Sequence, residues 1–309
     1  MRVLFINRPK NLWTGGDYIK LEKIAEELVK LGIEVDISET PLISPAVLMR
    51  QYDIIHTWNF SMLWSKFAVW AGVKWGKKMV ASMIYHNTEA HIPYELQQTM
   101  MNHMDACIYE TESEIKRVET HLIPKNTYVV PNGVDSWWFE QDDSKVPFEH
   151  YILTVGRIEP TKGQYEVAQA CKELGIRYIM IGESVSEDYT TLCLSEGAML
   201  YPAMNQDTLK KWYKNCSVYV QASSNETWGM AVDEAGTQGV PIVISTGFER
   251  QNIPDVILCK HGNKESIKEA IQKGLSQREN LSFKAELQLR TWKNCAEDYQ
   301  KIYNEILNK

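Results

Sequence analysis

The residues best placed for chemistry are two glutamates, Glu226 and Glu234, with Gly229 between them. A strand is expected at 217–221, and a helix is expected to follow Gly229 and to end near Gly239. The N-terminus of a helix suits an anion because its backbone amides are unpaired, and glycine lets a phosphate approach the backbone. The helix dipole alone favours an acidic first turn, but it does not account for the glycine after a buried strand. With a carboxylate on each side, the segment favours a ligand with an anionic centre and two hydroxyl-bearing ends, such as a nucleotide-sugar.

A second candidate is the loop Gly156–Gly163, between an expected strand at 151–155 and an expected helix at 162–174. Its Arg157 can bind a phosphate through two hydrogen bonds, and its Lys162 supplies a point charge. The loop has neither the order of a P-loop nor that of a dinucleotide-binding fingerprint. Taken alone it is equally compatible with a solvated loop that carries two surface cations. The nearby helix start that suits an anion favours a phosphate-binding role.

The first half of the chain offers weaker candidates. His86 follows a strand expected at 79–85, at the edge of a parallel sheet where ligands bind. Gly15 and Gly16 lie in the loop after the first strand, where they form either a simple turn or a backbone surface that faces a ligand. His56 is placed like His86, but we favour a structural or acceptor-side role for it.

Strand-like and helix-like segments alternate through both halves of the chain. Apolar runs predict strands at 3–6, 33–37, 53–56, 79–85, 106–109, 128–130, 151–155, 178–181, 199–201, 218–221 and 242–244. Such alternation predicts an α/β fold with two Rossmann-like, doubly wound parallel sheets facing a cleft. We expect one domain at 1–145, a second at 146–282, and a helical tail at 283–308, part of which belongs to the first domain.

Composition narrows the class of protein. A length of 309 residues suits two domains. The net charge of −7 weighs against a dedicated nucleic-acid binder. The cysteines form no CxxC pair and lie in apolar surroundings, and no stretch resembles a signal peptide or a membrane span, so we expect a cytoplasmic location. The histidines show no metal spacing and there is no Asp-x-Asp pair, so we expect no metal and no cofactor.

The stretch 62–80 has two interpretations. It contains three tryptophans and four lysines: Trp64, Trp70, Trp75, Lys66, Lys74, Lys77 and Lys78. These residue types next to an apolar helix are typical of a peripheral contact with a membrane surface. The simpler interpretation is a packed helix of a Rossmann-like domain with a solvated end.

Several motifs together resemble the retaining glycosyltransferases of family 4, which have the two-domain GT-B fold. The block 223–241 resembles the family's S-x-x-E-x-x-G…E-A…G-x-P signature, and 156–163 resembles its G-R-x4-K-G. Residues 131–135 read P-N-G-V-D, as in the family before the interdomain linker. Gly15-Gly16 and His86 match its N-terminal glycine loop and its histidine after a strand. The sequence departs from the pattern after 107–109, where Glu110 to Ser113 stand in place of a serine that follows the strand directly.

This resemblance implies a role for each residue. Arg157 and Lys162 would neutralise the diphosphate of the donor and stabilise its departure without a metal ion. The helix start, with Trp228, Gly229, Met230 and Ala231, would bind that diphosphate through backbone amides. Glu234 would hold the ribose hydroxyls, Glu226 would contact the donor sugar near the reacting carbon, and His86 would contact a sugar hydroxyl. Gly15, Gly16 and Met204, the last in a loop at 201–204, complete the expected donor site.

The expected activity is transfer of a sugar from a UDP- or GDP-sugar to a hydroxyl group, with retention of anomeric configuration. The acceptor stays open among glycans, lipid-linked glycans, small molecules and proteins, while nucleic acid is disfavoured by the acidic balance. Two alternatives share the fold: a sugar-nucleotide epimerase or phosphorylase, and an inactive protein that only binds nucleotide-sugars.

Overall fold

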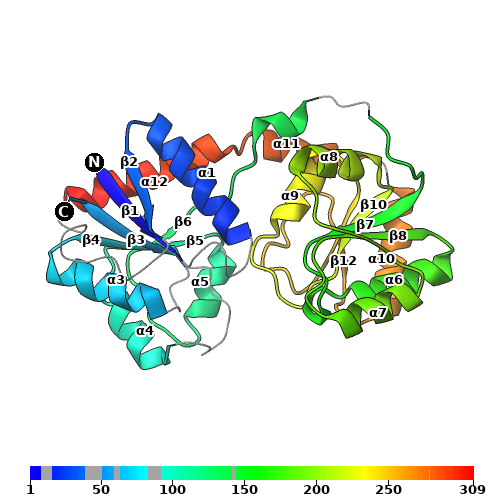
Figure 1. Ribbon diagram of the computed structural model, residues 1–309, viewed down its shortest axis with the longest axis horizontal. Helices are drawn as coiled ribbons and strands as arrows, with labels where there is room; N and C mark the ends of the chain where they lie inside the picture. The colour runs from blue at the N-terminus through cyan, green and yellow to red at the C-terminus, as the bar shows by residue number, and fades with distance from the viewer. Residues whose placement is uncertain (8–15, 39–50, 59–62, 83–91, 141–143, 278) are drawn as a thin grey trace. The chain divides into compact units, whose positions relative to one another are not determined.

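The chain forms two compact units, each built on one parallel sheet (Figure 1). The computed structural model describes the chain except for residues 8–15, 39–50, 59–62, 83–91, 141–143 and 278. The first unit comprises Met1–Gly133 and Trp292–Lys309, and the second comprises Val134–Thr291. The predicted α/β class with two parallel sheets is confirmed. The cleft expected between the units stays a prediction.

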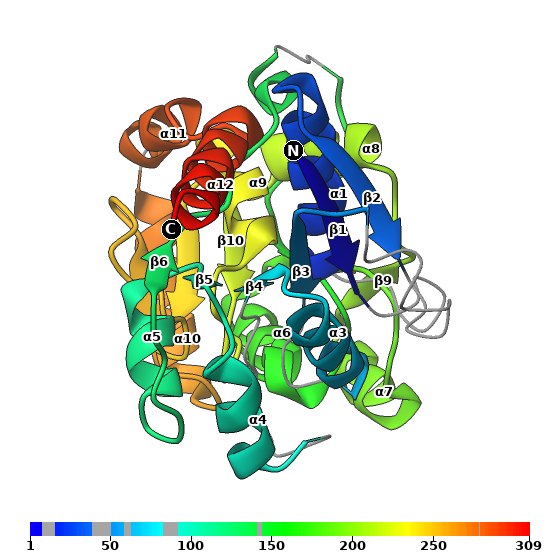
Figure 2. The same cartoon turned by 90° about the vertical axis from the view of Figure 1, so that its left-hand side faces the viewer.

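The sheet of the first unit has the strand order β2-β1-β3-β4-β5-β6. Its strands are β1 (Arg2–Ile6), β2 (Glu34–Ser38), β3 (Ile54–Trp58), β4 (Lys78–Ser82), β5 (Ala106–Tyr109) and β6 (Thr127–Val129). Its helices are α1 (Gly16–Lys30), α3 (Leu63–Lys74), α4 (Tyr94–Met101), α5 (Glu112–Val118) and α12 (Trp292–Leu307). Helices α1 and α12 pack together on one face of the sheet, and α3 and α4 lie on the other (Figure 2).

The sheet of the second unit has the order β12-β11-β10-β7-β8-β9. Its strands are β7 (Tyr151–Val155), β8 (Arg177–Ile181), β9 (Met199–Tyr201), β10 (Val218–Gln221), β11 (Ile242–Ser245) and β12 (Ile257–Cys259). Its helical elements are η1 (Ser136–Phe139), η2 (Pro160–Lys162), α6 (Gln164–Leu174), α7 (Glu187–Ser195), α8 (Gln206–Asn215), α9 (Met230–Thr237), α10 (Lys264–Ser276) and α11 (Leu281–Gln288).

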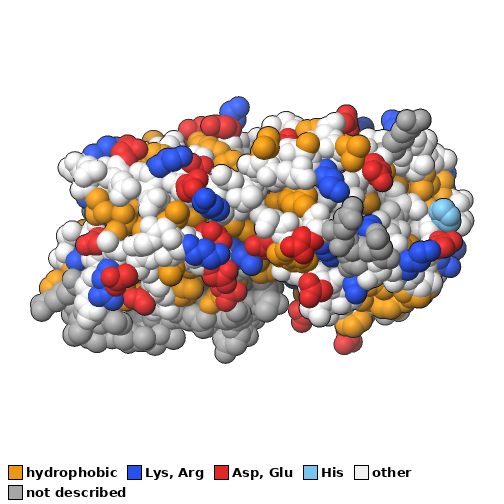
Figure 3. Space-filling view, turned by 90° about the horizontal axis from the view of Figure 1, so that it is seen from above, with side chains coloured by type: hydrophobic (Ala, Val, Ile, Leu, Met, Phe, Trp, Pro, Cys, Tyr) orange, Lys and Arg blue, Asp and Glu red, His pale blue; other side chains and the backbone are white. Residues whose placement is uncertain are grey.

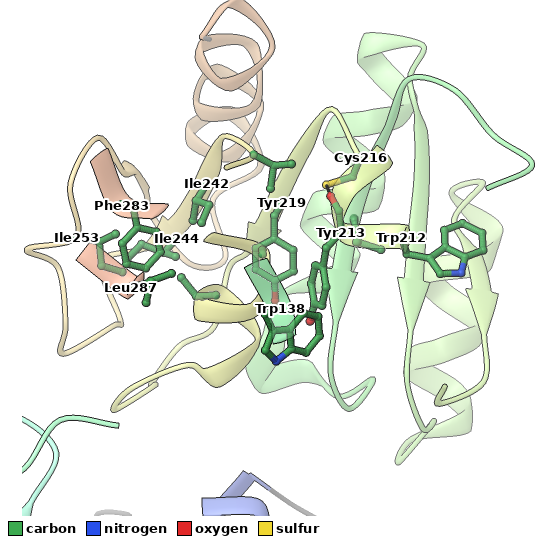
Figure 4. Close-up of a cluster of buried hydrophobic side chains, with 14 of the residues drawn as sticks. Trp138, Trp212, Tyr213, Cys216, Tyr219, Ile242, Ile244, Ile253, Phe283 and Leu287 are labelled. Carbon is green, nitrogen blue, oxygen red and sulfur yellow. Dashed lines mark hydrogen bonds between the residues drawn. The ribbon is translucent and has the colours of Figure 1, made fainter. Parts of the chain in front are cut away.

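The second sheet is buried on both faces, as its continuous apolar strands predict. In β7, Tyr151 and Leu153 point into a cluster on one face, and Ile152 points into a cluster on the other. The first cluster is drawn in Figure 4, where Tyr213 of α8 and Tyr219 of β10 lie side by side with ring centroids 5.6 Å apart. These two phenols also take part in the site described below.

Two boundaries differ from those expected. The first unit ends at Gly133 rather than at 145, because η1 places Trp138 in the core of the second unit. The tail expected as one helix forms two: α11 belongs to the second unit and α12 to the first. The break follows Leu289, where the Arg290 carbonyl accepts a hydrogen bond from the Val134 amide at 3.0 Å. The return of α12 to the first unit agrees with the expectation for the tail.

Candidate active site

The switch point of the second sheet lies between β7 and β10, the two strands that pair although they are far apart in the chain. In open parallel sheets, ligands bind beyond the carboxyl ends of the strands at such a point. The loops that follow β7 and β10 carry Lys162 and Glu226. The topology therefore brings these two predicted residues to one place.

The two loops are fastened to each other by their backbones. The Ser224 amide donates to the Thr161 carbonyl at 2.7 Å. Gly163 has φ +68°, and a Cβ there would lie 2.5 Å from the Ala222 carbonyl oxygen. Glycine is required at this position for both reasons, since other residues disfavour positive φ and no side chain fits. The close approach holds the end of η2 against the loop that carries Glu226.

Lys162 and Glu226 form the central ion pair of the site. Lys162 Nζ lies 2.6 Å from Glu226 Oε2, and their side chains are 18% and 21% exposed. Gln221 Nε2 donates to the same oxygen at 3.0 Å, and Tyr219 Oη donates to Gln221 Oε1 at 2.8 Å. The Glu226 carboxylate is thus oriented by a chain of hydrogen bonds that starts in the apolar cluster, while both charged groups keep access to solvent.

Arg157 lies on the same loop as Lys162 but points elsewhere. Its guanidinium is half exposed, and Nη2 lies 3.1 Å from Glu159 Oε1. Gln164 Nε2 donates to the Arg157 carbonyl at 2.7 Å and fixes the backbone of the loop. The structure therefore places Arg157 near the site as an accessible cation, without a described contact to the Lys162–Glu226 pair.

Helix α9 begins at Met230, directly after its N-cap residue Gly229, so a helix follows Gly229 as the sequence predicts. Gly229 has φ +77°, and a Cβ there would lie 2.5 Å from Phe248 Cε1. The amides that open the helix have no carbonyl one turn earlier to bind, so they suit an anion. Met230 and Ala231 at this start are partly exposed, and Met204 is partly buried against the apolar cluster.

Glu234 lies one turn into α9, against the same apolar cluster. Its Oε2 accepts a hydrogen bond from Tyr213 Oη at 2.8 Å. Burial raises the pKa of Glu234 to about 7, against a lowering by Tyr213, and the nearby Asp233 and Asp135 raise it further. The carboxyl group is therefore poised to change charge near neutral pH.

The side chain of Trp228 contacts other residues of the second unit. It is buried, and its Nε1 donates to Asp233 Oδ2 at 2.6 Å. Asp233 also pairs with Arg250 at 2.5 Å and with Arg290 at 3.0 Å, and both guanidinium carbons lie within 4.5 Å of the Trp228 ring centroid. This network fixes the turn before α9. Because the side chain of Trp228 is engaged in it, only the backbone of Trp228 can contact a donor.

The candidates of the first unit are mostly not described. Gly15 and His86 lie outside the residues that the structure describes, and Gly16 is the exposed first residue of α1. His56 is fully buried and bonds Tyr303 Oη at 2.6 Å and Ser82 Oγ at 2.9 Å. Burial lowers the pKa of His56 well below its usual range, with a smaller contribution from Lys20. Of the two roles considered for His56, structural or acceptor-side, this geometry fits the structural one, because Nδ1 bonds α12 and Nε2 bonds the end of β4.

Sequence reasoning missed the residues that support the site. Gln221, Tyr219, Tyr213 and Asp233 all bond a predicted site residue directly or through one neighbour. The one available signal was Gln221, a polar residue at the end of an otherwise apolar strand. Among the described residues, no group of three or more His, Cys, Asp or Glu side chains is arranged to hold a metal ion.

Two family models match adjoining parts of the chain. The model of glycosyl transferases group 1 matches residues 139–289, and that of glycosyltransferase family 4 matches residues 40–137. Together they span most of the chain. This chain belongs to the glycosyltransferases of group 1 and family 4.

The individual curated relatives of this chain are distant. It is 24% identical to D-inositol 3-phosphate glycosyltransferase of Segniliparus rotundus over 50% of this chain and 41% of that protein. It is 30% identical to an uncharacterized glycosyltransferase of Methanocaldococcus jannaschii over 38% of this chain and 36% of that protein. The aligned part spans about two fifths of the length of these curated relatives.

Solved structures match the fold of this chain over nearly all of its length. HepE of Anabaena, in complex with UDP, superposes with a TM-score of 0.81 at 15% identity, covering 99% of this chain and 100% of that one. Sucrose-phosphate synthase of Thermosynechococcus elongatus gives 0.78 at 15% identity, covering 99% of both chains. The expected GT-B fold is thereby confirmed.

Proposed function

We propose that the protein transfers a sugar from a nucleotide-diphosphate sugar to an acceptor hydroxyl, with retention of configuration and without a metal ion. The observation that carries this proposal is the Lys162–Glu226 pair at the switch point of the second sheet. It sets a cation and a carboxylate side by side beyond the sheet edge where ligands of this fold class bind.

In the proposed reaction, the bond between the sugar carbon and the diphosphate oxygen breaks, and its electron pair leaves with the diphosphate. A bond from the acceptor oxygen to the same carbon forms, and the acceptor proton passes to the departing phosphate or to solvent. Lys162, Arg157 and the first amides of α9 stabilise the charge that develops on the leaving group. Because the Lys162–Glu226 pair is partly exposed, Lys162 can exchange the carboxylate for a phosphate when the donor binds.

The two glutamates divide the donor between them. Glu226, freed from Lys162, contacts the donor sugar near the reacting carbon. Glu234 accepts hydrogen bonds from the ribose hydroxyls, because Tyr213 occupies only one of its oxygens in the described contacts. This role needs the carboxylate form, so nucleotide binding strengthens as the pH rises through about 7, the pKa of Glu234.

UDP-sugars are the first donors to test, with GDP-sugars next. HepE has been solved with UDP and with UDP-glucose, and a trehalose-6-phosphate protein of E. coli with UDP-2-fluoro glucose. The acceptor is a glycan, a lipid-linked glycan or a small molecule. The six buried free cysteines support a reducing compartment such as the cytoplasm.

The decisive experiment is a thermal-shift screen of UDP, GDP and their sugars, with and without EDTA. A ligand at about 100 times its Kd stabilises the folded state by about 2.7 kcal/mol, which such a screen detects. The donor that binds is then incubated with acceptors of the three classes, and the product is analysed by NMR. We expect a glycoside with the anomeric configuration of the donor, formed equally well in EDTA.

Each other result contradicts part of the proposal. An inverted product contradicts retention, and loss of activity in EDTA contradicts metal independence. A sugar phosphate or an epimerised donor identifies a phosphorylase or an epimerase. Donor binding without transfer or donor hydrolysis identifies a protein that only binds nucleotide-sugars.

A further inference from the structure

Helix α3 of the first unit is apolar on its outer side as well as on its inner side. Its inner side chains Ala68, Val69 and Ala71 are buried in the core of the unit. On the outer side, Phe67 is 49% exposed, Trp70 63% and Val73 40%, at intervals of three residues that place them on one face. A surface helix ordinarily has a polar outer face, and one that is apolar all round is ordinarily covered. The outer face of α3 therefore needs an occupant.

The charged side chains of α3 and of the sequence that flanks it are all lysines. Lys66 lies beside Phe67, and Lys74 Nζ lies 5.1 Å from the ring centroid of Trp70. The sequence from 54 to 88 contains no Asp or Glu, although the whole chain has a net charge of −7. By contrast, acidic and basic side chains are interspersed on the face of the molecule drawn in Figure 3. The occupant is therefore expected to be anionic.

We propose that the α3 face, made of Lys66, Phe67, Trp70, Val73 and Lys74, docks the protein on an anionic lipid bilayer. Tryptophan is favoured at the level of the lipid headgroups, and lysine on an apolar helix binds anionic lipid while its stem lies along the apolar surface. The helix lies on the outside of its sheet, beside α4 (Figure 2). It lies in the plane of the surface, since among the described residues no helix is long and apolar enough to cross a membrane.

A second copy of the chain fits this face less well. A symmetric contact would place the same patch on both partners and bring the lysines of one copy toward those of the other. A bilayer of anionic lipids instead offers an apolar layer beneath a negative surface, which matches both properties of the face. The proposal does not depend on the proposed transferase activity.

The test is co-sedimentation of the whole protein with lipid vesicles at low salt. One set contains about one third phosphatidylglycerol in phosphatidylcholine, and the other contains phosphatidylcholine alone. We expect binding to the anionic vesicles, at least about tenfold weaker binding to neutral ones, and a decrease as salt is added. The pair Phe67→Ser and Trp70→Ser should weaken binding about tenfold or more, and Lys66→Glu with Lys74→Glu should do the same.

The matched control is Ile19→Ser, which removes an exposed apolar side chain of α1 in the same unit. It should leave vesicle binding unchanged, and all variants should keep the melting temperature of the original chain within a few degrees. Absence of wild-type binding to anionic vesicles overturns the proposal, as does equal binding by the α3 variants. If vesicles do not bind but the α3 variants change the sedimentation coefficient of the free protein, the face contacts a second copy instead.

Discussion

Each unit contains a lysine–glutamate pair of nearly the same geometry in very different surroundings. In the second unit, Lys162 and Glu226 are 2.6 Å apart and about one fifth exposed. In the first unit, Lys20 and Glu110 are 2.9 Å apart, with side chains 3% and 9% exposed. A pair with access to water can separate and bind a ligand at little cost, whereas separating a buried pair leaves a desolvated charge. Residue types alone therefore do not distinguish a reactive pair from a structural one.

The buried pair connects distant parts of the first unit. Lys20 lies on α1, and Glu110 directly follows β5. Glu110 Oε1 also accepts a hydrogen bond from Asn132 Nδ2 at 3.0 Å, and Asn132 lies in the P-N-G-V-D segment at the boundary of the two units. Glu110 belongs to the stretch at which the sequence departs from the family pattern. In the structure, Glu110 forms an ion pair with Lys20, so this departure from the family pattern has a structural role.

The largest effect is expected from breaking the buried pair. Lys20→Met should lower the free energy of unfolding by about 3–5 kcal/mol, because it leaves the Glu110 carboxylate buried without its counter-charge. Urea denaturation measures this change. The double variant Lys20→Met with Glu110→Met should recover most of the loss, since it removes both charges. If Lys20→Met lowers the free energy of unfolding by less than about 1 kcal/mol, burial does not make the Lys20–Glu110 pair costlier to break than the Lys162–Glu226 pair.

Next in size is the effect of breaking the exposed pair. Lys162→Ala or Glu226→Ala should lower kcat by about 10²–10³-fold, since each removes a group proposed to act on the leaving diphosphate or the sugar. The free energy of unfolding should change by no more than about 1 kcal/mol, because the pair is partly solvated. Steady-state transfer or donor hydrolysis measures the activity, and urea denaturation the stability. Lys172→Ala, which removes an exposed pair with Glu196, serves as the control and should change neither. Full activity in either site variant contradicts the assignment.

Glu234 should show opposite effects on stability and on binding. Its pKa rises from 4.5 to about 7 on folding, so the folded state holds more protons and stability falls as the pH rises through this window. Glu234→Gln removes the cost of burying a charged carboxylate, so it should stabilise the protein at about pH 8 by up to roughly 3 kcal/mol. Below 4.5, the ordinary pKa of the glutamate, the substitution should bring no gain in stability. It should weaken nucleotide binding and remove the dependence of binding on pH near 7. Urea denaturation and nucleotide titration across this range measure both, and unchanged nucleotide affinity contradicts the ribose role.

The strands were predictable from the sequence because buried parallel strands are continuous apolar runs, as in 151–155 and 218–221. The contact of Lys162 with Glu226 could not be predicted from the sequence. It depends on the pairing of β10 with β7, whereas β9 is the strand that precedes β10 in the chain. The orientation of Trp228 likewise depends on Arg250 and Arg290, which lie far along the chain. Local patterns predict elements and strand ends, whereas the partners of a side chain follow from strand order and packing.

The break in the C-terminal helical tail has the same kind of cause. The sequence from 283 to 307 contains neither Gly nor Pro, so no helix-breaking residue predicts an end at Leu289. The helix stops because Arg290 is held by Asp233 and by the Val134 amide, both within the second unit. Tertiary contacts here override a helical pattern that is otherwise continuous.

The smallest effect is expected at Arg157. Its ion pair with Glu159 is more exposed than the Lys162–Glu226 pair and the Lys20–Glu110 pair, so it extends the comparison to a half-exposed cation. Arg157→Gln should change the free energy of unfolding by less than about 0.5 kcal/mol, while nucleotide affinity falls several-fold and depends less on salt. Glu159 competes with a phosphate for the same guanidinium, at 3.1 Å. Glu159→Gln should therefore act in the opposite direction and raise nucleotide affinity by about two- to threefold. Titration of both variants with UDP at two salt concentrations measures these changes. A fall in affinity in both variants would mean that Arg157 and Glu159 act together to shape the loop, so that Arg157 positions the site rather than binding phosphate.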